Sequence, residues 1–162
     1  MKQFLTSVLS FTMIFSLTTC LAQNKLSQAL SKPSGVTKLK IEYTPIANLP
    51  PAIGTLADLK TLYLFKNGLD SLPVEIGNLE NLRFLVIGKN SLTYLPDEIG
   101  NLTRLRELNV AYCGPMVRIP ETISNCKSLE YIYVDKSILL PYSINNVNPR
   151  LQVLIKERGV LN

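Results

Sequence analysis

The sequence predicts a solenoid, in which one supersecondary unit is stacked on copies of itself around a continuous apolar core. Two observations predict it. A short phrase recurs along the chain at nearly constant spacing, and runs of alternating apolar residues lie between its copies. A repeat period of about 20–50 residues is typical of such architectures, because a single unit cannot bury its apolar face alone.

The recurring phrase pairs an apolar residue and a proline with a short turn that ends in another apolar residue. It reads LPPAIGTL from Leu49, LPVEIGNL from Leu72, LPDEIGNL from Leu95 and IPETISNC from Ile119. The first three copies begin 23 residues apart, the fourth begins after 24, and a fifth, looser copy begins at Leu140. The unit is therefore regular in the middle of the chain and less regular toward its ends.

Between two phrases the chain is predicted to form a short strand. Apolar residues alternate there with other residues, in a β-branched and aromatic context, and this period of two is typical of strands. Because each strand recurs once per repeat, neighbouring strands run in the same direction and form one parallel sheet. The alternating pairs are Leu62 and Leu64, Leu85 and Ile87, Leu108 and Val110, and Ile132 and Val134.

The combined pattern LxxLxLxxNxLxxLPxxIGNL resembles the leucine-rich repeat family over roughly residues 36 to 155. The resemblance implies an α/β-type leucine-rich repeat solenoid of about five to six coils, with a short parallel sheet on its concave face and irregular or 3-10 turns on its convex face. It also implies a structural ladder, in which Asn67 and Asn90 turn inward and bond to backbone groups of the adjacent coil. Cys113 and Ser137 take the next two places, where their smaller polar groups would weaken the ladder.

The chain is predicted to divide into a leader, two caps and the repeat domain. Residues 1–22 have the layout of a secretory signal peptide, because a basic start precedes an uncharged and mostly apolar stretch. Residues 23–35 would form an N-terminal cap and residues 36–155 the leucine-rich repeat domain. Residues 156–162 would be the C-terminal tail of the cap at that end.

The sequence leaves two processing routes open for the leader. Cleavage after Ala22 suits an ordinary signal peptidase, whereas Leu17-Thr18-Thr19-Cys20 resembles a degenerate bacterial lipobox in which Cys20 would carry lipid. Either route predicts an exported protein of the bacterial envelope, which is periplasmic, on the cell surface or secreted. Contact with a membrane is expected only if Cys20 is lipidated.

The composition argues against an enzyme. The chain has no histidine, which removes His-based acid–base catalysis, Ser-His and Cys-His nucleophile pairs and most zinc sites. We therefore expect no catalytic residue, no metal site and no cofactor. The 17 basic and 12 acidic residues are spread without runs, so no nucleic-acid partner is expected. Pairing of Cys113 with Cys126 in an oxidising compartment is left open.

The face of the sheet that is turned away from the core is the predicted binding site. Where Leu62 and Leu64 point inward, their neighbours point outward, and stacking aligns these neighbours in columns across the sheet. Exposed aromatic residues rimmed by charges are typical of interfaces, although strands also favour aromatic residues for their own stability. The predicted partner-binding residues are Lys40, Tyr63, Phe65, Phe84, Glu107, Asn109, Tyr131 and Tyr133.

The sequence thus predicts a non-enzymatic leucine-rich repeat module that binds a protein or a peptide through its concave face. A glycan is an alternative ligand, because Tyr63, Phe84 and Tyr133 would stack on sugar rings. The competing hypothesis is a lipid-anchored structural or adhesive component of the envelope, held by Cys20. No motif indicates the identity of the partner or the oligomeric state.

Overall fold

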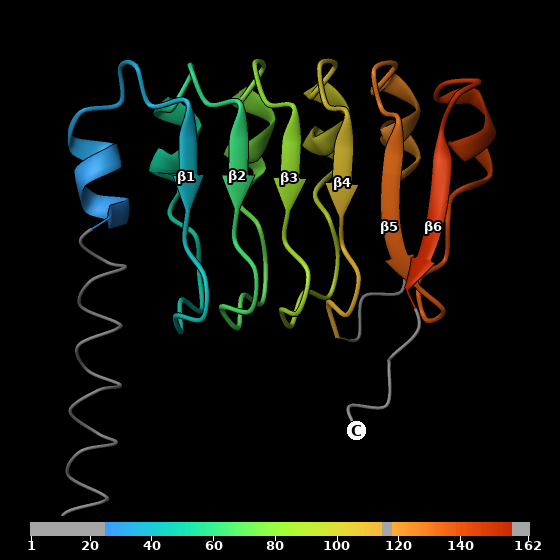
Figure 1. Ribbon diagram of the computed structural model, residues 1–162, viewed down its shortest axis with the longest axis horizontal. Coiled ribbons are helices and arrows are strands. Elements are labelled where there is room, and N and C mark those ends of the chain that lie inside the picture. Colours follow the sequence, from blue (N-terminus) through green and yellow to red (C-terminus); the bar gives the residue numbers. More distant parts are fainter. Residues whose placement is uncertain (1–24, 115–117, 157–162) are drawn as a thin grey trace, which may run out of the picture.

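The computed structural model of the protein describes residues 25–114 and 118–156. This part of the chain forms one open sheet with short 3-10 turns behind it, and its coils stack from one end of the molecule to the other (Figure 1). All strands run parallel and lie side by side in the order of the sequence, which confirms the predicted solenoid. The predicted signal peptide at residues 1–22, with Cys20, and residues 157–162 of the predicted tail lie outside the described residues.

Strands and turns alternate regularly along the described chain. The strands are β1 (Lys38–Lys40), β2 (Thr61–Tyr63), β3 (Phe84–Val86), β4 (Glu107–Asn109), β5 (Tyr131–Asp135) and β6 (Gln152–Lys156). The turns are η1 (Pro51–Thr55), η2 (Val74–Asn78), η3 (Asp97–Asn101), η4 (Glu121–Asn125) and η5 (Tyr142–Asn146).

The sheet register aligns the inward-facing residues of successive strands into one apolar row. Leu39 pairs with Leu62, and the row continues through Leu85 and Leu108 to Ile132. The last four of these side chains have 0% exposure. They are fully buried because each coil lies between two neighbours that cover it on both sides.

The convex side of each coil is a 3-10 turn that begins after a proline. Pro73, for example, has a φ of −71° and an extended ψ of 151°, and η2 follows it directly. Neighbouring turns pack very closely where the phrase has glycine. A Cβ added to Gly77 would lie 2.7 Å from the backbone oxygen of Glu98 in the next coil, and one on Gly100 would lie 2.5 Å from that of Thr122. Glycine at these positions is therefore required by the stacking distance.

The chain leaves the sheet through a left-handed residue three positions after each of the first four strands. The backbone N–H groups of these residues still bond toward the following coil, as in the 3.1 Å bond from Lys66 to the carbonyl of Gly88. The left-handed region costs about 1–2 kcal/mol for a residue other than glycine. The four residues are Tyr43 (φ 54°), Lys66 (57°), Lys89 (55°) and Tyr112 (62°).

Two buried asparagines hold successive coils together. The side-chain oxygen of Asn67 accepts the backbone N–H of Thr44 at 3.0 Å, and its amide donates to the carbonyl of Ile41 at 2.8 Å. Asn90 repeats the arrangement one coil later, accepting from the N–H of Asn67 at 2.9 Å and donating to the carbonyl of Leu64 at 2.7 Å. Each side chain therefore bonds to backbone groups that the coil turn would otherwise leave without partners.

The ladder changes character in the following coils. The thiol of Cys113 is buried and donates to the carbonyl of Ile87 in the preceding coil at 3.1 Å. Ser137 departs from the expectation that it continues the ladder, because it is exposed and both its N–H and its hydroxyl bond to the carboxylate of Asp135. The longer strand β5 reaches Asp135, whose other oxygen accepts the N–H of Tyr112 at 2.6 Å. Asp135, two positions before Ser137, thus makes the side-chain bond between these two coils.

The two cysteines in the described residues are free, so the structure answers the open question of their pairing. Cys126 is fully buried, and its thiol donates to the carbonyl of Ile99 at 3.3 Å. Burial raises the pKa of Cys113 and of Cys126 to about 12. Both residues therefore act as small, neutral core side chains.

The N-terminal end of the solenoid is covered by a helix. Residues 25–31 are helical and lie beside β1, as Figure 1 shows. Leu26 is buried, and Ala29 and Leu30 pack against the core as well. Within the described residues, no helix has the length and the apolar character that a membrane span needs.

Candidate functional site

The predicted binding residues all lie on the sheet or directly after a strand, on the face turned away from the core. We call this surface the sheet face; it corresponds to the concave face of the prediction. Parallel register builds its columns, because each outward residue pairs with the outward residue of the next strand. One column runs from Lys38 through Thr61, Phe84 and Glu107 to Tyr131, and the next runs from Lys40 through Tyr63, Val86 and Asn109 to Tyr133.

Exposure differs among these residues. Phe84 and Tyr131 are 39% and 37% exposed. Tyr63, Phe65 and Tyr133 are half-buried because their neighbours on the sheet cover part of each ring. Lys40 is exposed, and Glu107 and Asn109 are half-buried. The aromatic rings are thus within reach of a partner.

The aromatic residues at the N-terminal half of the sheet face form a connected group. The rings of Tyr63 and Phe65 have centroids 6.2 Å apart, at a tilt of 45°. Tyr43 joins them edge-on, with its centroid 6.2 Å from that of Phe65, and is itself 62% exposed. Sequence reasoning left Tyr43 out of the predicted set. Its recurring position just after the strand was the signal that it belongs to this surface.

Lysine ammonium groups lie over most of these rings. Lys40 is 5.1 Å from the centroid of Tyr63, and its ammonium also forms an ion pair of 2.7 Å with Glu42. The hydrogen bond that the Lys40 ammonium donates to the carboxylate of Glu42 raises the pKa of Lys40. Cation–π contacts of this kind contribute about 0.5–1 kcal/mol at exposed sites. The other three pairs are Lys66 over Tyr43 (5.2 Å), Lys89 over Phe65 (5.6 Å) and Lys156 over Tyr133 (4.9 Å).

The sheet face has two aromatic groups, one formed by Tyr43, Tyr63 and Phe65 and the other by the tyrosines of β5. A strip of small side chains separates them. It lies on and after β3 and β4, where Val86 and Ala111 are buried although the alternation points them outward. A Cβ on Gly88 would meet the backbone oxygen of Ala111 at 2.8 Å and the side-chain oxygen of Asn109 at 3.1 Å. The backbone is therefore closest to the surface here, between Tyr63 and Phe65 on one side and the tyrosines of β5 on the other.

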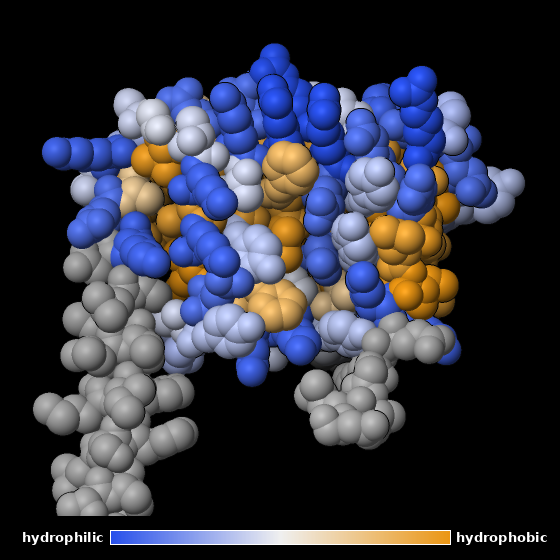
Figure 2. All heavy atoms as spheres, viewed as in Figure 1, coloured by the Kyte–Doolittle hydropathy of each residue, from blue (hydrophilic) through white to orange (hydrophobic). Residues whose placement is uncertain are grey.

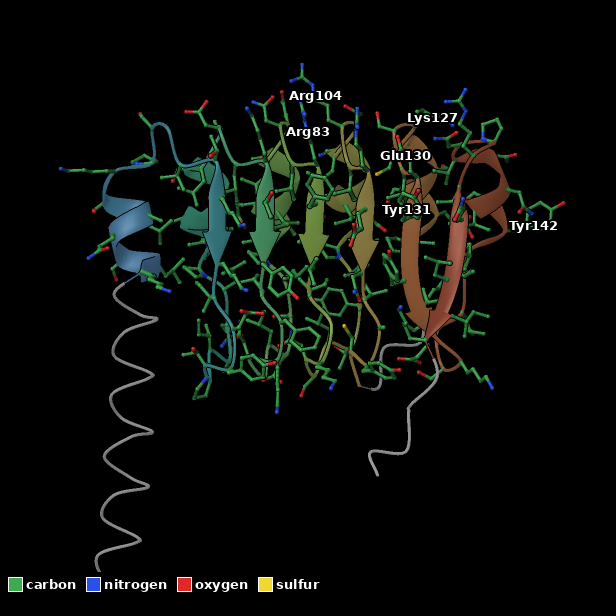
Figure 3. All side chains as sticks on the ribbon, in the orientation of Figure 1. Arg83, Arg104, Lys127, Glu130, Tyr131 and Tyr142 are labelled. Carbon is green, nitrogen blue, oxygen red and sulfur yellow. The ribbon has the colours of Figure 1, made fainter. Side chains whose placement is uncertain are left out.

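Basic side chains also line the opposite edge of the sheet, where the strands begin. Arg83, Arg104 and Lys127 point away from the coils at this edge in Figure 3. Arg104 donates to the side-chain oxygen of Asn81 at 2.5 Å, and Lys127 donates to the carbonyl of Asn146 at 2.7 Å. Figure 2 shows hydrophilic atoms crowded along this edge and a mixture of hydrophilic and hydrophobic atoms across the face.

The side chains of the sheet face can recognise a partner by ring stacking, by charge and by hydrogen bonds. In the described chain, no three Cys, Asp or Glu side chains group as metal ligands would. The buried side-chain nitrogen and oxygen atoms of the same residues all have hydrogen-bond partners. An enclosed reactive site, with an unpaired polar group aimed into it, is thus not found among residues 25–114 and 118–156.

Comparison with known proteins identifies the repeat. A sequence profile described as a leucine-rich repeat region matches residues 3–114. This chain belongs to the leucine-rich repeat family. No curated protein matches it significantly. The leucine-rich repeat fold is typically a non-enzymatic scaffold, and its repeat domains generally mediate protein–protein binding.

Solved leucine-rich repeat structures show the same fold. A leucine-rich repeat protein of Leptospira interrogans is 28% identical with a TM-score of 0.56, covering 79% of this chain and 38% of that one. The functional domain of InlJ from Listeria monocytogenes is 20% identical with a TM-score of 0.66, over 79% of this chain and 26% of that one. The leucine-rich repeat ectodomain of the Arabidopsis thaliana receptor kinase GASSHO1/SCHENGEN3, solved with CASPARIAN STRIP INTEGRITY FACTOR 2, is 32% identical with a TM-score of 0.57, over 67% of this chain and 13% of that one. This chain therefore spans less than two-fifths of each of these structures.

Proposed function

We propose that this leucine-rich repeat domain is a non-enzymatic module of an exported bacterial protein and that it binds a protein or a peptide through the sheet face. One observation carries the proposal. Parallel register aligns Phe84 and Tyr131 in one outward column and Tyr63 and Tyr133 in the next, with lysine ammonium groups at ring distance. Aromatic residues framed by charge are enriched in the binding surfaces of proteins.

The size of the sheet face favours a peptide or a short protein segment. Six strands at a spacing of about 4.8 Å span about 24 Å, and the outward part of each strand adds about 15 Å in the other direction. The projected face is therefore on the order of 300–400 Å², whereas a standard protein interface buries about 800 Å² per partner. An extended segment laid across the strip between the two aromatic groups would contact both of them.

Two structural relatives were solved together with a partner, which supports a binding role for the repeat scaffold. The GASSHO1/SCHENGEN3 ectodomain was solved in complex with CASPARIAN STRIP INTEGRITY FACTOR 2, and the plant peptide hormone receptor RGFR1 was solved in complex with RGF2. RGFR1 is 27% identical to this chain with a TM-score of 0.54. The likeness concerns the repeat scaffold, and the residues proposed for binding are this chain's own.

Affinity capture with matched variants tests the proposal. The double variant Tyr63→Ser/Tyr133→Ser removes one ring from each aromatic group of the sheet face. Its control is Tyr94→Ser/Tyr142→Ser, because these tyrosines are 54% and 91% exposed and lie away from the sheet face. We expect the native chain and the control to retain the same partner from a bacterial envelope fraction, and the sheet-face variant to lose it. Equal capture by all three folded chains would refute the proposal.

Export is tested by the mass of the mature chain. Ordinary cleavage after Ala22 would leave Gln23 as the first residue. Retention of Cys20 with added lipid would instead favour the lipid-anchored structural or adhesive component. An unprocessed chain that stays inside the cell would contradict export altogether.

A further inference from the structure

The two ends of the solenoid are protected very differently. At the N-terminal end, the helix at residues 25–31 covers the first coil, and β1 carries Lys38 and Lys40 on its outward face. A covering helix and charged residues on an edge strand are two devices by which proteins prevent unwanted strand pairing. In the described part of the C-terminal end no helix covers β6, and its outward face carries a single charged residue, Lys156.

At the C-terminal end, core positions of the repeat are exposed. Val153 pairs in register with Ile132, and Ile155 pairs with Val134. The two β5 residues are buried, at 0% and 2% exposure, whereas Val153 is 37% and Ile155 is 59% exposed. Figure 2 shows hydrophobic atoms gathered at this end of the molecule. Tyr142, which is 91% exposed, also points outward past the last coil (Figure 3).

Strand β6 is also the last strand of the described sheet. It pairs with β5 along its whole length, from Gln152 to Lys156, and no described strand lies on its other side. Among the described residues, no strand pairs with the backbone groups on that side. The strand contains no proline and no charge on its core side, and its lysine ammonium lies over the ring of Tyr133 at 4.9 Å. Such an edge is a template for pairing.

We propose that β6 pairs antiparallel with β6 of a second copy of this chain, which makes a two-fold dimer with one continuous sheet. This inference does not depend on the proposed function of the sheet face. The two-fold register places Leu154 opposite Leu154 of the second copy, and Val153 opposite Ile155. Gln152 then lies opposite Lys156, so no like charges meet and apolar residues meet on the core side. A self-complementary strand is what a two-fold interface requires.

The proposed dimer has a small interface, so its association should be weak. Five residues on each side form a much smaller interface than the roughly 1,200–2,000 Å² of stable complexes. Association should therefore depend on concentration and appear toward the upper micromolar and millimolar range. In the dimer the two sheet faces point to the same side, which doubles the length of the aromatic and basic surface.

Disulfide trapping tests the register directly. Residues directly opposite in an antiparallel pair have Cα atoms about 4.5–5.5 Å apart, which is within the range of about 4.4–6.8 Å that a disulfide needs. We therefore expect Leu154→Cys alone to form a disulfide-linked dimer under mild oxidation. Of the three native cysteines, Cys113 and Cys126 are buried and will not compete, and Cys20 is replaced by serine in every chain of the test.

A matched variant on the same strand provides the control. Gln152→Cys alone should not crosslink, because two copies of this residue lie on the order of 13 Å apart along the paired strands. A mixture of Gln152→Cys chains with Lys156→Cys chains should crosslink in the heterologous pair. Equal crosslinking of Leu154→Cys and Gln152→Cys would overturn the register, since it would indicate random collision.

Sedimentation of the full chain tests dimer formation without introduced cysteines. The native chain should approach twice the monomer mass as its concentration rises, and Val153→Glu/Ile155→Glu should stay at the monomer mass. Both substituted residues are exposed, so the variant should fold. The control Val74→Glu, on the convex side at 53% exposure, should dimerise like the native chain. A native chain that remains monomeric throughout, because residues 157–162 or another segment cover β6, would overturn the proposal.

Discussion

The side-chain oxygen of Asn90 accepts the backbone N–H of Asn67 from the preceding coil at 2.9 Å. The same oxygen accepts the N–H of Leu69 at 3.1 Å, and the amide nitrogen donates to the carbonyls of Leu64 and Ile87 at 2.7 and 2.6 Å. One buried side chain therefore satisfies four backbone groups from two coils. Because Asn67 makes corresponding bonds to the coil before it, the two residues act in series.

Removing Asn90 should destabilise the domain strongly. In Asn90→Ala the four backbone groups lose their partner in a site that is 6% exposed, and leaving buried polar groups unpaired costs about 1–3 kcal/mol each when water does not replace the bond. We expect a loss of about 2–4 kcal/mol in the free energy of unfolding, measured by denaturant titration. The control Asn145→Ala removes an exposed amide and should change stability by less than about 0.5 kcal/mol. Similar values for both variants would contradict the ladder.

The close packing of the convex turns predicts that alanine is destabilising at the glycine position of η2 but not at the equivalent position of η4. In Gly77→Ala the new Cβ would lie 2.7 Å from the backbone oxygen of Glu98, so the next coil must shift. Overpacking of this kind costs about 1–3 kcal/mol. Ser124 occupies the equivalent position in η4 and already carries a Cβ, so Ser124→Ala should cost less than about 0.5 kcal/mol. Thermal unfolding of both variants checks this difference in stability. A Gly77→Ala protein as stable as the native chain would show that the next coil moves aside without a cost in stability.

The buried thiols predict a loss of stability in alkali. Burial raises the pKa of Cys113 and Cys126 to about 12 from an ordinary value of 9.0, so the unfolded chain releases these protons at lower pH than the folded chain. Their contribution to stability is therefore complete below pH 9 and is lost as the pH rises from there toward 12. Each thiol adds a slope of up to about 1.4 kcal/mol per pH unit.

The double variant Cys113→Ala/Cys126→Ala isolates this effect. Its stability should be lower than that of the native chain at neutral pH, because two core side chains are truncated. Between pH 9 and pH 11 its stability should fall less steeply than that of the native chain, as followed by denaturant titration at each pH. Parallel slopes for the two proteins would show that the thiols do not stay protonated in the folded state.

The left-handed turn residues predict positions that tolerate glycine. Lys89 has a φ of 55°, which costs about 1–2 kcal/mol for a side-chain-bearing residue, while glycine adds about 0.5–1 kcal/mol of lost backbone entropy. Loss of the contact with Phe65 costs about 0.5–1 kcal/mol more. These contributions nearly cancel, so Lys89→Gly should leave the free energy of unfolding within about 0.5 kcal/mol of the native value. Lys60→Gly, at an exposed position outside the left-handed set, relieves no strain and should lower the free energy of unfolding by about 0.5–1 kcal/mol. Equal losses in the two variants, measured by denaturant titration, would contradict the strain at Lys89.

Much of the sheet face could be predicted because it depends only on alternation and period. Tyr63 and Tyr133 fall in one column because 23-residue and 24-residue spacings bring their strands into register. The positions of the lysine ammonium groups could not be predicted in this way. Whether Lys66 reaches the ring of Tyr43 depends on a left-handed turn and on side-chain rotamers, and neither follows from hydrophobic period.

Ser137 shows where the repeat pattern misleads. Its place in the alignment is that of Asn67, but β5 is longer than the strands before it and carries Asp135 into the bonding position. A carboxylate at that point accepts the N–H of Tyr112 and also binds Ser137 itself. Local strand length, which alternation alone does not determine, decided between the two residues.

By itself the sequence determined the parallel solenoid, the apolar row through Leu62 and Leu85, and which face of the sheet carries the aromatic residues. These features follow from local periodicity, because a strand has only two faces and a stacked repeat has only one interior. Only the tertiary structure decided that Val153 and Ile155 are exposed. They continue the pattern of buried residues, but burial depends on a neighbouring coil, and no described coil covers β6.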